Sequence, residues 1–394
     1  MADFSFEDSL PLCREPLESV SPVDRFFEYP AFCYTAESSE AFLAAMREAM
    51  LFQYGHSRIL GALYDSESFD PVSVRTEEDV KRIPFLSVSA LKERDLTTLP
   101  YSQIVLELRS SGTSGQRSRM QLDMGSLLRV RRMAWQVFSG LGLTAPEKVH
   151  NYLCFTYDPA VAKDLGTAWT DKLLSGFTAG KEIYYAFRWD GEKKDFYFDA
   201  DGSVKALKSF EEQDMPVRIV GFPAFALKLT DDFKNVHGRY PKLKSDSSVI
   251  TGGGWKTLED GSLPKKVYRQ ILADRLGIPV GNVRDLYGMV EHGVPYVDCP
   301  EGNFHVPVYG RIIVRDPATL APLPYGARGL LQFVTPYLTS YPSLSVLSSD
   351  FGVLREKCGC GLGGPVLEIS GRAGVRKLKG CAVSAASMLS GRGK

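Results

Sequence analysis

A glycine-rich segment between two regular elements constrains the fold of this chain most. Residues 101–110, YSQIVLELRS, have a strand-like apolar pattern and run directly into SGTSGQRS at residues 111–118. Residues 123–142, DMGSLLRVRRMAWQVFSGLG, then predict a helix that ends at glycine. A strand, a glycine loop and a helix in this order are typical of a phosphate-binding site.

The loop contains the groups that bind phosphate. Glycine permits positive φ angles and a close approach of backbone N–H groups to an anion, while hydroxyl and guanidinium groups donate further hydrogen bonds. The ATPase P-loop pattern does not fit, because it needs four residues between its glycines and then Gly-Lys-Ser/Thr. On its own, the segment is equally compatible with a polar surface turn. The candidate phosphate ligands are Ser110, Ser111, Gly112, Thr113, Ser114, Gly115 and Arg117, with Arg119 as an alternative cation.

Helices and strands alternate through most of the chain. Apolar spacing predicts a helix over residues 39–63, strands at 151–156, 216–221 and 247–251, and helices at 222–235 and 263–276. This alternation predicts layered α/β sheets. After residue 305, short strands separated by Pro and Gly predict a smaller β-rich subdomain. The expected organisation is a lead-in segment (1–36), an α/β core (37–304), the β-rich subdomain (305–371) and a short tail (372–394).

Charge and cysteine usage narrow the class of protein. The chain has 47 basic and 47 acidic residues, so its net charge of zero argues against bulk attraction to nucleic acid or anionic membranes. It shows no secretory leader pattern and no apolar run of the roughly 18 residues that span a bilayer. Its seven cysteines are unevenly placed, which favours a reducing compartment. We therefore expect a cytoplasmic protein without a nucleic-acid partner or stable membrane insertion.

The loop resembles the phosphate loop of adenylate-forming enzymes, with an arginine where that family usually places lysine. Further blocks follow in the family's order: TGGGWK at 251–256, LYGMVEHG at 286–293, SSDFG at 348–352 and SGR at 370–372. The resemblance implies an α/β fold like the large N-terminal domain of these enzymes, with layered sheets and a small β-rich subdomain. It also implies that the chain binds ATP and Mg²⁺.

The resemblance assigns a role to each block. It places Gly252, Gly253, Gly254, Tyr287 and Gly288 beside the adenine, Asp350 on the ribose hydroxyls and Arg372 on ribose or phosphate. It makes Glu291 the magnesium ligand and Lys256 a contact of the acyl carboxylate or the α-phosphate. Trp255, His292 and Gly293 would line the substrate pocket. Val290 replaces the family's threonine, which removes one hydroxyl.

Four residues form a candidate metal site: Cys299, His305, Cys358 and Cys360. Three thiolates and one imidazole would make a closed tetrahedral zinc site, which is structural rather than catalytic. The arrangement resembles that of the phenylacetate–CoA ligase branch of adenylate-forming enzymes. The alternative is separate buried thiols and a surface histidine. Cys13, Cys33 and Cys154 are interpreted as packing residues, and His150 as a core histidine.

The C-terminal residues resemble a more specific family. Only 22 residues follow Arg372, so we expect the usual C-terminal domain of adenylate-forming enzymes to be absent. The GGGWK block and a Gly-Cys near the end resemble the acyl-protein synthetases of the bacterial bioluminescence fatty-acid reductase complex. The basic residues before Cys381 favour the thiolate, but charge alone fits an ordinary tail cysteine equally well; the resemblance makes Cys381 the acyl acceptor. It implies activation of a fatty acid as acyl-adenylate, transfer to Cys381, and passage to a partner such as an acyl reductase.

Two other functions fit parts of the pattern. An aryl- or acyl-CoA ligase of the phenylacetate–CoA ligase type would use CoA as the acceptor. A non-catalytic nucleotide- or acyl-binding module would explain Val290 and the missing loop lysine, but not the presence of Glu291, Asp350 and Arg372.

Overall fold

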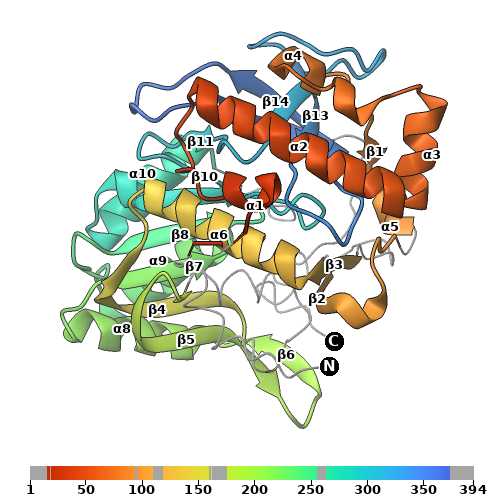
Figure 1. Ribbon diagram of the computed structural model, residues 1–394. Coiled ribbons are helices and arrows are strands. Elements are labelled where there is room, and N and C mark those ends of the chain that lie inside the picture. The colour runs from red at the N-terminus through yellow and green to blue at the C-terminus, as the bar shows by residue number, and fades with distance from the viewer. Residues whose placement is uncertain are drawn as a thin grey trace.

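The computed structural model describes residues 16–17, 19–93, 96–109, 119–158, 161, 175–254 and 263–372. These residues form a seven-stranded sheet, a six-stranded sheet and a two-stranded hairpin, with helices packed around them (Figure 1). The predicted α/β class with layered sheets is confirmed. The division into segments at residues 36, 304 and 371 stays a prediction.

The first helices differ from the sequence prediction at one residue. α1 (Pro22–Phe26) is followed by α2 (Ala36–His56) and α3 (Arg58–Ser66), where a single helix over 39–63 was predicted. That prediction was wrong because Ser57 adopts extended backbone angles, φ −100° and ψ 107°, and caps the next helix. Its hydroxyl accepts a hydrogen bond from the Leu60 N–H at 3.4 Å. The short helices α4 (Glu77–Val80) and α5 (Val88–Glu93) follow.

The seven-stranded sheet has a parallel centre. Its order is β10-β9-β8-β7-β4-β5-β6, and the edge strands β10 and β6 are antiparallel to their neighbours. The strands predicted at 151–156, 216–221 and 247–251 and the helices predicted at 222–235 and 263–276 are confirmed as β4, β7, β8, α9 and α10, whereas the other elements of this region were not predicted. The strands are β4 (Ala145–Tyr157), β5 (Thr178–Asp190), β6 (Asp195–Phe198), β7 (Val217–Gly221), β8 (Ser248–Gly252), β9 (Val283–Tyr287) and β10 (Tyr296–Val297); the helices are α8 (Ala200–Glu212), α9 (Pro223–His237) and α10 (Lys265–Leu276).

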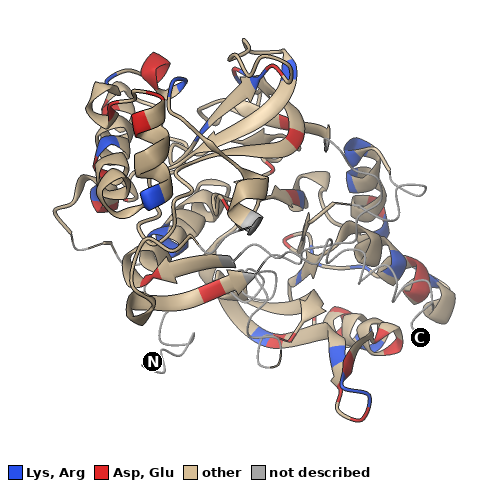
Figure 2. Ribbon diagram, turned by 90° about the vertical axis from the view of Figure 1, so that its right-hand side faces the viewer, with Lys and Arg blue, Asp and Glu red and all other residues tan. Residues whose placement is uncertain are grey.

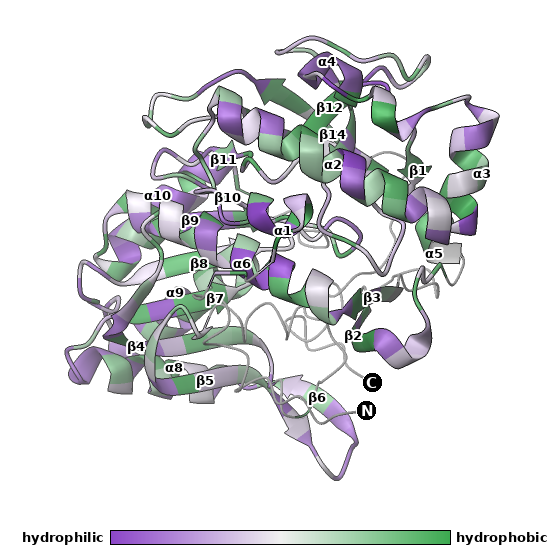
Figure 3. Ribbon diagram, viewed as in Figure 1, coloured by the Kyte–Doolittle hydropathy of each residue, from purple (hydrophilic) through white to green (hydrophobic). Residues whose placement is uncertain are grey.

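Both faces of this sheet are buried. Along β4, Leu153 and Phe155 pack with the core formed by α8, α9 and α10, while Tyr152 and Cys154 pack with the core on the opposite face. Strands covered on both faces are mostly apolar, and the hydropathy colouring of β7 and β8 in Figure 3 agrees with this. Cys154 is fully buried, and His150 is buried with its Nδ1 2.9 Å from the Lys148 carbonyl, so both lie in the core as predicted.

The six-stranded sheet contains the short strands predicted after residue 305, and α2 lies across it (Figure 1). Its order is β11-β15-β14-β13-β12, and the early strand β1 pairs in parallel with β14. This pairing joins the N-terminal part of the chain to the β-rich part. The strands are β1 (Leu86–Ser87), β11 (Phe304–His305), β12 (Arg311–Arg315), β13 (Arg328–Val334), β14 (Ser345–Arg355) and β15 (Val366–Arg372).

A hairpin brackets the glycine loop. β2 (Ile104–Arg109) and β3 (Arg119–Asp123) are antiparallel, and α6 (Met124–Gly140) begins only after β3. The strand and the helix predicted on either side of the loop are present, but the expected strand–loop–helix order is wrong, because residues 119–123 pair with β2. Short 3₁₀ helices cover Pro71–Ser73, Tyr101–Gln103 and Val280–Asn282.

The distribution of charged and apolar residues on the described helices is as expected from the sequence. Figure 2 shows basic and acidic residues mixed on the same helices, as the zero net charge suggests. In the part of the chain that the structure describes, no helix combines the length and apolarity needed to cross a membrane.

Candidate functional site

The carboxyl ends of the central parallel strands bring two of the predicted blocks together. In the register, Gly252 at the end of β8 lies opposite Leu286 near the end of β9. A Cβ on Gly252 would lie 2.9 Å from the Leu286 carbonyl oxygen, so only glycine fits there. Gly253 and Gly254 continue with φ of +77° and +68°. The chain thus leaves this sheet edge as bare backbone, beside the strand that ends at Tyr287.

Tyr287 links this edge to the six-stranded sheet. Its hydroxyl donates a hydrogen bond to Asp350 Oδ2 at 2.8 Å, and Asp350 lies on β14. The Ser348 hydroxyl accepts from the Asp350 N–H at 3.0 Å, and the Arg372 backbone lies opposite Asp350 in the β14–β15 register. Three blocks that are far apart in sequence therefore meet at the junction of the two sheets, where the aromatic ring, the carboxylate and the strand carrying Arg372 are adjacent.

The residues after Gly288 turn back into the core. Glu291 is 5% exposed and His292 is fully buried. His292 Nε2 lies 2.7 Å from the Tyr296 hydroxyl, and its ring stacks on Tyr296 and tilts against Phe333. Gly293 has a φ of +71°. The carboxylate oxygens of Glu291 are of the kind that Mg²⁺ prefers as ligands. The His292 side chain instead packs among aromatic rings.

The burial of His292 predicts a pH dependence of stability. Burial lowers the pKa of His292 to about 3, below its usual value near 6.5. As the pH falls, His292 is protonated in the unfolded chain before it is protonated in the folded protein. The contribution of neutral His292 to the free energy of unfolding is therefore complete above pH 6.5 and is lost towards pH 3. Below pH 6.5 the free energy of unfolding of the wild type should fall by up to ~1.4 kcal/mol per pH unit more than that of His292→Gln. Urea unfolding of both proteins between pH 4 and 8 measures this difference, and parallel pH profiles would contradict it.

Several predicted site residues lie outside the described residues or are described only in their backbone. Those outside are Ser110, Ser111, Gly112, Thr113, Ser114, Gly115, Arg117, Trp255, Lys256 and Cys381. Arg119 and Arg372 are described by their backbone alone. The roles of all these residues stay predictions.

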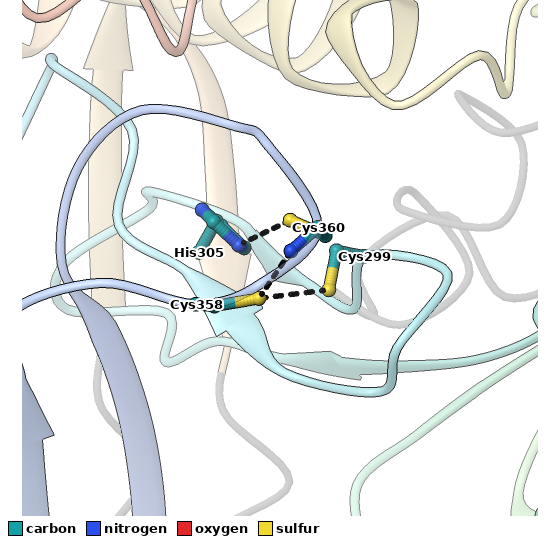
Figure 4. A group of neighbouring side chains, drawn as sticks. All are labelled: Cys299, His305, Cys358 and Cys360. Atoms are coloured by element: carbon teal, nitrogen blue, oxygen red, sulfur yellow. Dashed lines mark hydrogen bonds between the residues drawn. The ribbon is translucent and has the colours of Figure 1, made fainter.

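The four candidate metal ligands form one cluster (Figure 4). Their ligand atoms all lie within 4.8 Å of one another, with Cys299 Sγ 3.9 Å from Cys358 Sγ and Cys360 Sγ 3.1 Å from His305 Nε2. Around a tetrahedral zinc with bonds of about 2.3 Å to sulfur and 2.0 Å to nitrogen, ligand atoms are spaced at roughly this range. The donor set and its geometry therefore fit zinc, and the alternative of scattered thiols and a surface histidine is wrong.

Hydrogen bonds act on two members of the cluster, His305 and Cys299. His305 Nδ1 lies 3.2 Å from the Gly363 carbonyl, which favours a proton on Nδ1 and leaves Nε2 to bind metal. Burial raises the pKa of the Cys299 thiol, but hydrogen bonds from His305 and the Asn303 N–H outweigh it and lower this pKa to about 6. A thiolate is the form that zinc requires.

Metal content tests the cluster directly. Purified protein should contain close to one zinc per chain, and Cys358→Ser should reduce this to below about a tenth, because a structural zinc site needs all four ligands. Cys33→Ser is the control, since Cys33 lies outside the cluster. Elemental analysis of the three proteins measures the outcome. Substoichiometric zinc in the wild type would contradict the assignment.

Sequence reasoning missed two features of the site. The Phe222 ring, just after β7, lies 2.9 Å from where a Gly253 Cβ would be, so it borders the glycine turn. Its position directly after a buried strand was the available signal. Lys265 and Asp298 form an ion pair of 2.6 Å, and Lys265 lies over the Phe304 ring, which is a neighbour of the Tyr287 ring. No sequence motif marks that pair.

Comparisons with known proteins agree with this picture. A family model described as "Acyl-protein synthetase, LuxE" matches residues 9–390. The long-chain-fatty-acid–luciferin-component ligase of Vibrio harveyi is 27% identical over 308 residues, which cover 78% of either chain. The ligase of the same name from Aliivibrio fischeri is 27% identical over 316 residues, 79% of either chain.

Solved structures share the fold. An open conformation of 2-hydroxyisobutyryl-CoA ligase has a TM-score of 0.67 and 18% identity, covering 88% of this chain and 79% of that one. The same ligase in its postadenylation state has a TM-score of 0.66 and 17% identity, covering 91% and 74%. At this identity the likeness is evidence for the fold alone, which is that of adenylate-forming ligases.

Proposed function

The chain belongs to the acyl-protein synthetase (LuxE) family, and from that premise we propose that it activates a long-chain fatty acid with ATP and transfers the acyl group to its own Cys381. As a member of this family it is a ligase that activates a carboxylic acid with ATP and transfers the acyl group. The chain length, the acceptor cysteine and the roles of single residues are parts of the proposal. The names of the Vibrio harveyi and Aliivibrio fischeri relatives support a long-chain substrate.

The contact between Tyr287 and Asp350 carries the proposal for the nucleotide site. It holds an aromatic ring and a carboxylate side by side at the edge where Gly252 and Gly253 expose their backbone. An aromatic face suits a purine, and a carboxylate accepts hydrogen bonds from both ribose hydroxyls. We place the adenosine of ATP here, with Phe222 on the far side of the glycine turn, towards the acid.

The first step forms acyl-adenylate. A carboxylate oxygen of the acid attacks the α-phosphorus of ATP, the bond to the β,γ-phosphates breaks, and pyrophosphate leaves. Residues 110–115 and an arginine hold the phosphates, and Lys256 stabilises the charge on the α-phosphate. Glu291 would hold Mg²⁺, which neutralises part of the phosphate charge when bound.

The second step makes the thioester. The Cys381 thiolate attacks the acyl carbonyl carbon, the bond from that carbon to the AMP oxygen breaks, and AMP leaves with the electron pair. Zinc held by Cys299, His305, Cys358 and Cys360 would take no part in this reaction; it would join the segment after β10 to the loop between β14 and β15.

The acyl group then passes to a partner. A thioester on a protein cysteine is chemically suited to reduction to aldehyde, and we propose an acyl reductase as the partner. A CoA ligase of the phenylacetate–CoA ligase type is not favoured, because the family match is to acyl-protein synthetases. The cytoplasmic location stays a prediction.

A panel of acids tests the function. Wild-type protein is incubated with ATP, Mg²⁺ and saturated fatty acids of graded length, or with phenylacetate, and pyrophosphate–ATP exchange is measured with and without CoA. We expect exchange that depends on a long-chain acid and does not need CoA. Exchange that no acid stimulates would contradict the proposal, and acyl transfer seen only with CoA would favour the ligase.

A further inference from the structure

Lys265, the first residue of α10, lies between two acidic side chains. Its Nζ is 2.6 Å from Asp298 Oδ1 and 3.5 Å from Asp285 Oδ2, and it lies 3.5 Å from the centroid of the Phe304 ring. The Asp298 side chain is fully buried, whereas those of Lys265 and Asp285 are about one-third exposed, at 32% and 33%. The ammonium group therefore pairs with both carboxylates, while Arg269 adds a more distant positive charge near Asp298.

The same carboxylates join two strands at the nucleotide site. Asp298 Oδ2 accepts from the Asp285 N–H at 3.0 Å, and the Asp298 N–H donates to the Asp285 carbonyl at 2.9 Å. The next pairs in the register are Leu286 with Val297 and Tyr287 with Tyr296. Asp298 thus joins β10 to β9 at Asp285, two residues before Tyr287, the residue whose hydroxyl donates to Asp350.

Removing the ammonium group would leave the buried Asp298 carboxylate facing that of Asp285, with Arg269 as the remaining nearby cation for Asp298. Like charges in such a site repel, and an uncompensated buried charge is strongly unfavourable. The repulsion would act on the hydrogen bonds that join Asp285 and Asp298. β9 and β10 would separate at this point, and the Tyr287 ring would shift relative to Asp350.

We propose that Lys265 is a positioning residue for the nucleotide: by pairing with Asp298 and Asp285 it holds the end of β9 so that Tyr287 and Asp350 together present the adenosine site. This inference rests on the proposed function, because it assigns ATP to that site. Lys265 acts through Tyr287 and does not contact the reacting atoms.

A set of variants tests this role. Lys265→Met keeps the length and apolar stem of the side chain but removes its charge; Lys265→Arg keeps the charge; Lys266→Met alters the exposed neighbour. ATP–pyrophosphate exchange gives KM for ATP and for the acid separately, and zinc content and thermal unfolding are measured on the same samples. A purely structural ion pair would change the unfolding temperature without selecting one substrate.

Lys265→Met should raise KM for ATP about tenfold or more and leave KM for the acid within about twofold. Lys265→Arg should restore KM for ATP to within about threefold, and Lys266→Met should match the wild type. Unchanged KM for ATP in Lys265→Met, an equal rise for both substrates, or zinc loss that accounts for the defect would overturn the inference.

A double variant keeps the test decisive if Lys265→Met folds poorly. Lys265→Met/Asp285→Asn removes one carboxylate together with its cation, so repulsion is relieved and KM for ATP should return towards the wild-type value. A double variant that folds but retains the full ATP defect would contradict the inference. A wild-type enzyme without acid-dependent exchange would count against the proposed function instead, so the two failures are distinguishable.

Discussion

Cys381→Ala should abolish the covalent acyl-enzyme and leave acid-dependent ATP–pyrophosphate exchange close to the wild-type rate. Adenylation needs the nucleotide site and the phosphate-binding residues, whereas only the second step uses the thiol. Mass spectrometry of the intact protein after incubation with ATP, Mg²⁺ and a long-chain acid measures the acyl adduct. Neutral hydroxylamine, which cleaves thioesters, establishes its chemical class.

Cys33→Ala is the matched control, because Cys33 is a partly exposed free cysteine that the proposal leaves out of the reaction. It should form the adduct in wild-type amount. An acyl adduct that persists in Cys381→Ala would move the acceptor to another residue. Loss of exchange together with the adduct would instead place Cys381 in the first step.

Asp350→Asn should raise KM for ATP in the exchange reaction by about 10–150-fold. The amide keeps the shape of the side chain but loses the charge and one acceptor oxygen, and a hydrogen bond to a charged group contributes about 1.5–3 kcal/mol. The same change weakens the acceptor for the Tyr287 hydroxyl. Tyr287→Phe, which removes that hydroxyl but keeps the ring, should give a smaller rise.

Asp214→Asn is the matched control for charge loss. The Asp214 side chain is 83% exposed and the residue has a φ of +50°, a conformation that asparagine tolerates. Its KM for ATP should equal that of the wild type. If Asp350→Asn behaves like this control in steady-state kinetics, the ribose contact is wrong.

The local spacing of apolar residues predicted which helices and strands are present better than it predicted where they begin and end. Strand–helix alternation correctly predicted β7, α9 and β8, because each element buries a continuous apolar stripe or run. The break between α2 and α3 at Ser57 was not predicted. The apolar spacing continues across it, and a single capping serine does not change that spacing. β3 was missed although Met120 and Leu122 alternate with polar neighbours, because five residues are short beside the helix that follows.

Long-range contacts of the site came from the resemblance or were not predicted. Tyr287 and Asp350 are 63 residues apart, and no property of either residue alone predicts that they meet. The Cys/His cluster could be predicted from the sequence, because cysteine and histidine are uncommon residues and their side chains bind metal ions. The pair of Lys265 and Asp298, 33 residues apart, could not be predicted from the sequence. Lysines and aspartates are common, and most of them face solvent.

A single-turnover experiment tests the central claim most directly. Wild-type protein, ATP with a labelled α-phosphate, Mg²⁺ and a labelled long-chain acid are mixed without CoA, and acyl-adenylate, AMP and protein-bound acyl group are followed in time. We predict that acyl-adenylate appears first and decays as one acyl group per chain becomes hydroxylamine-sensitive and maps to Cys381. Acyl-adenylate that persists until CoA is added, with no acyl group on the protein, would contradict the account.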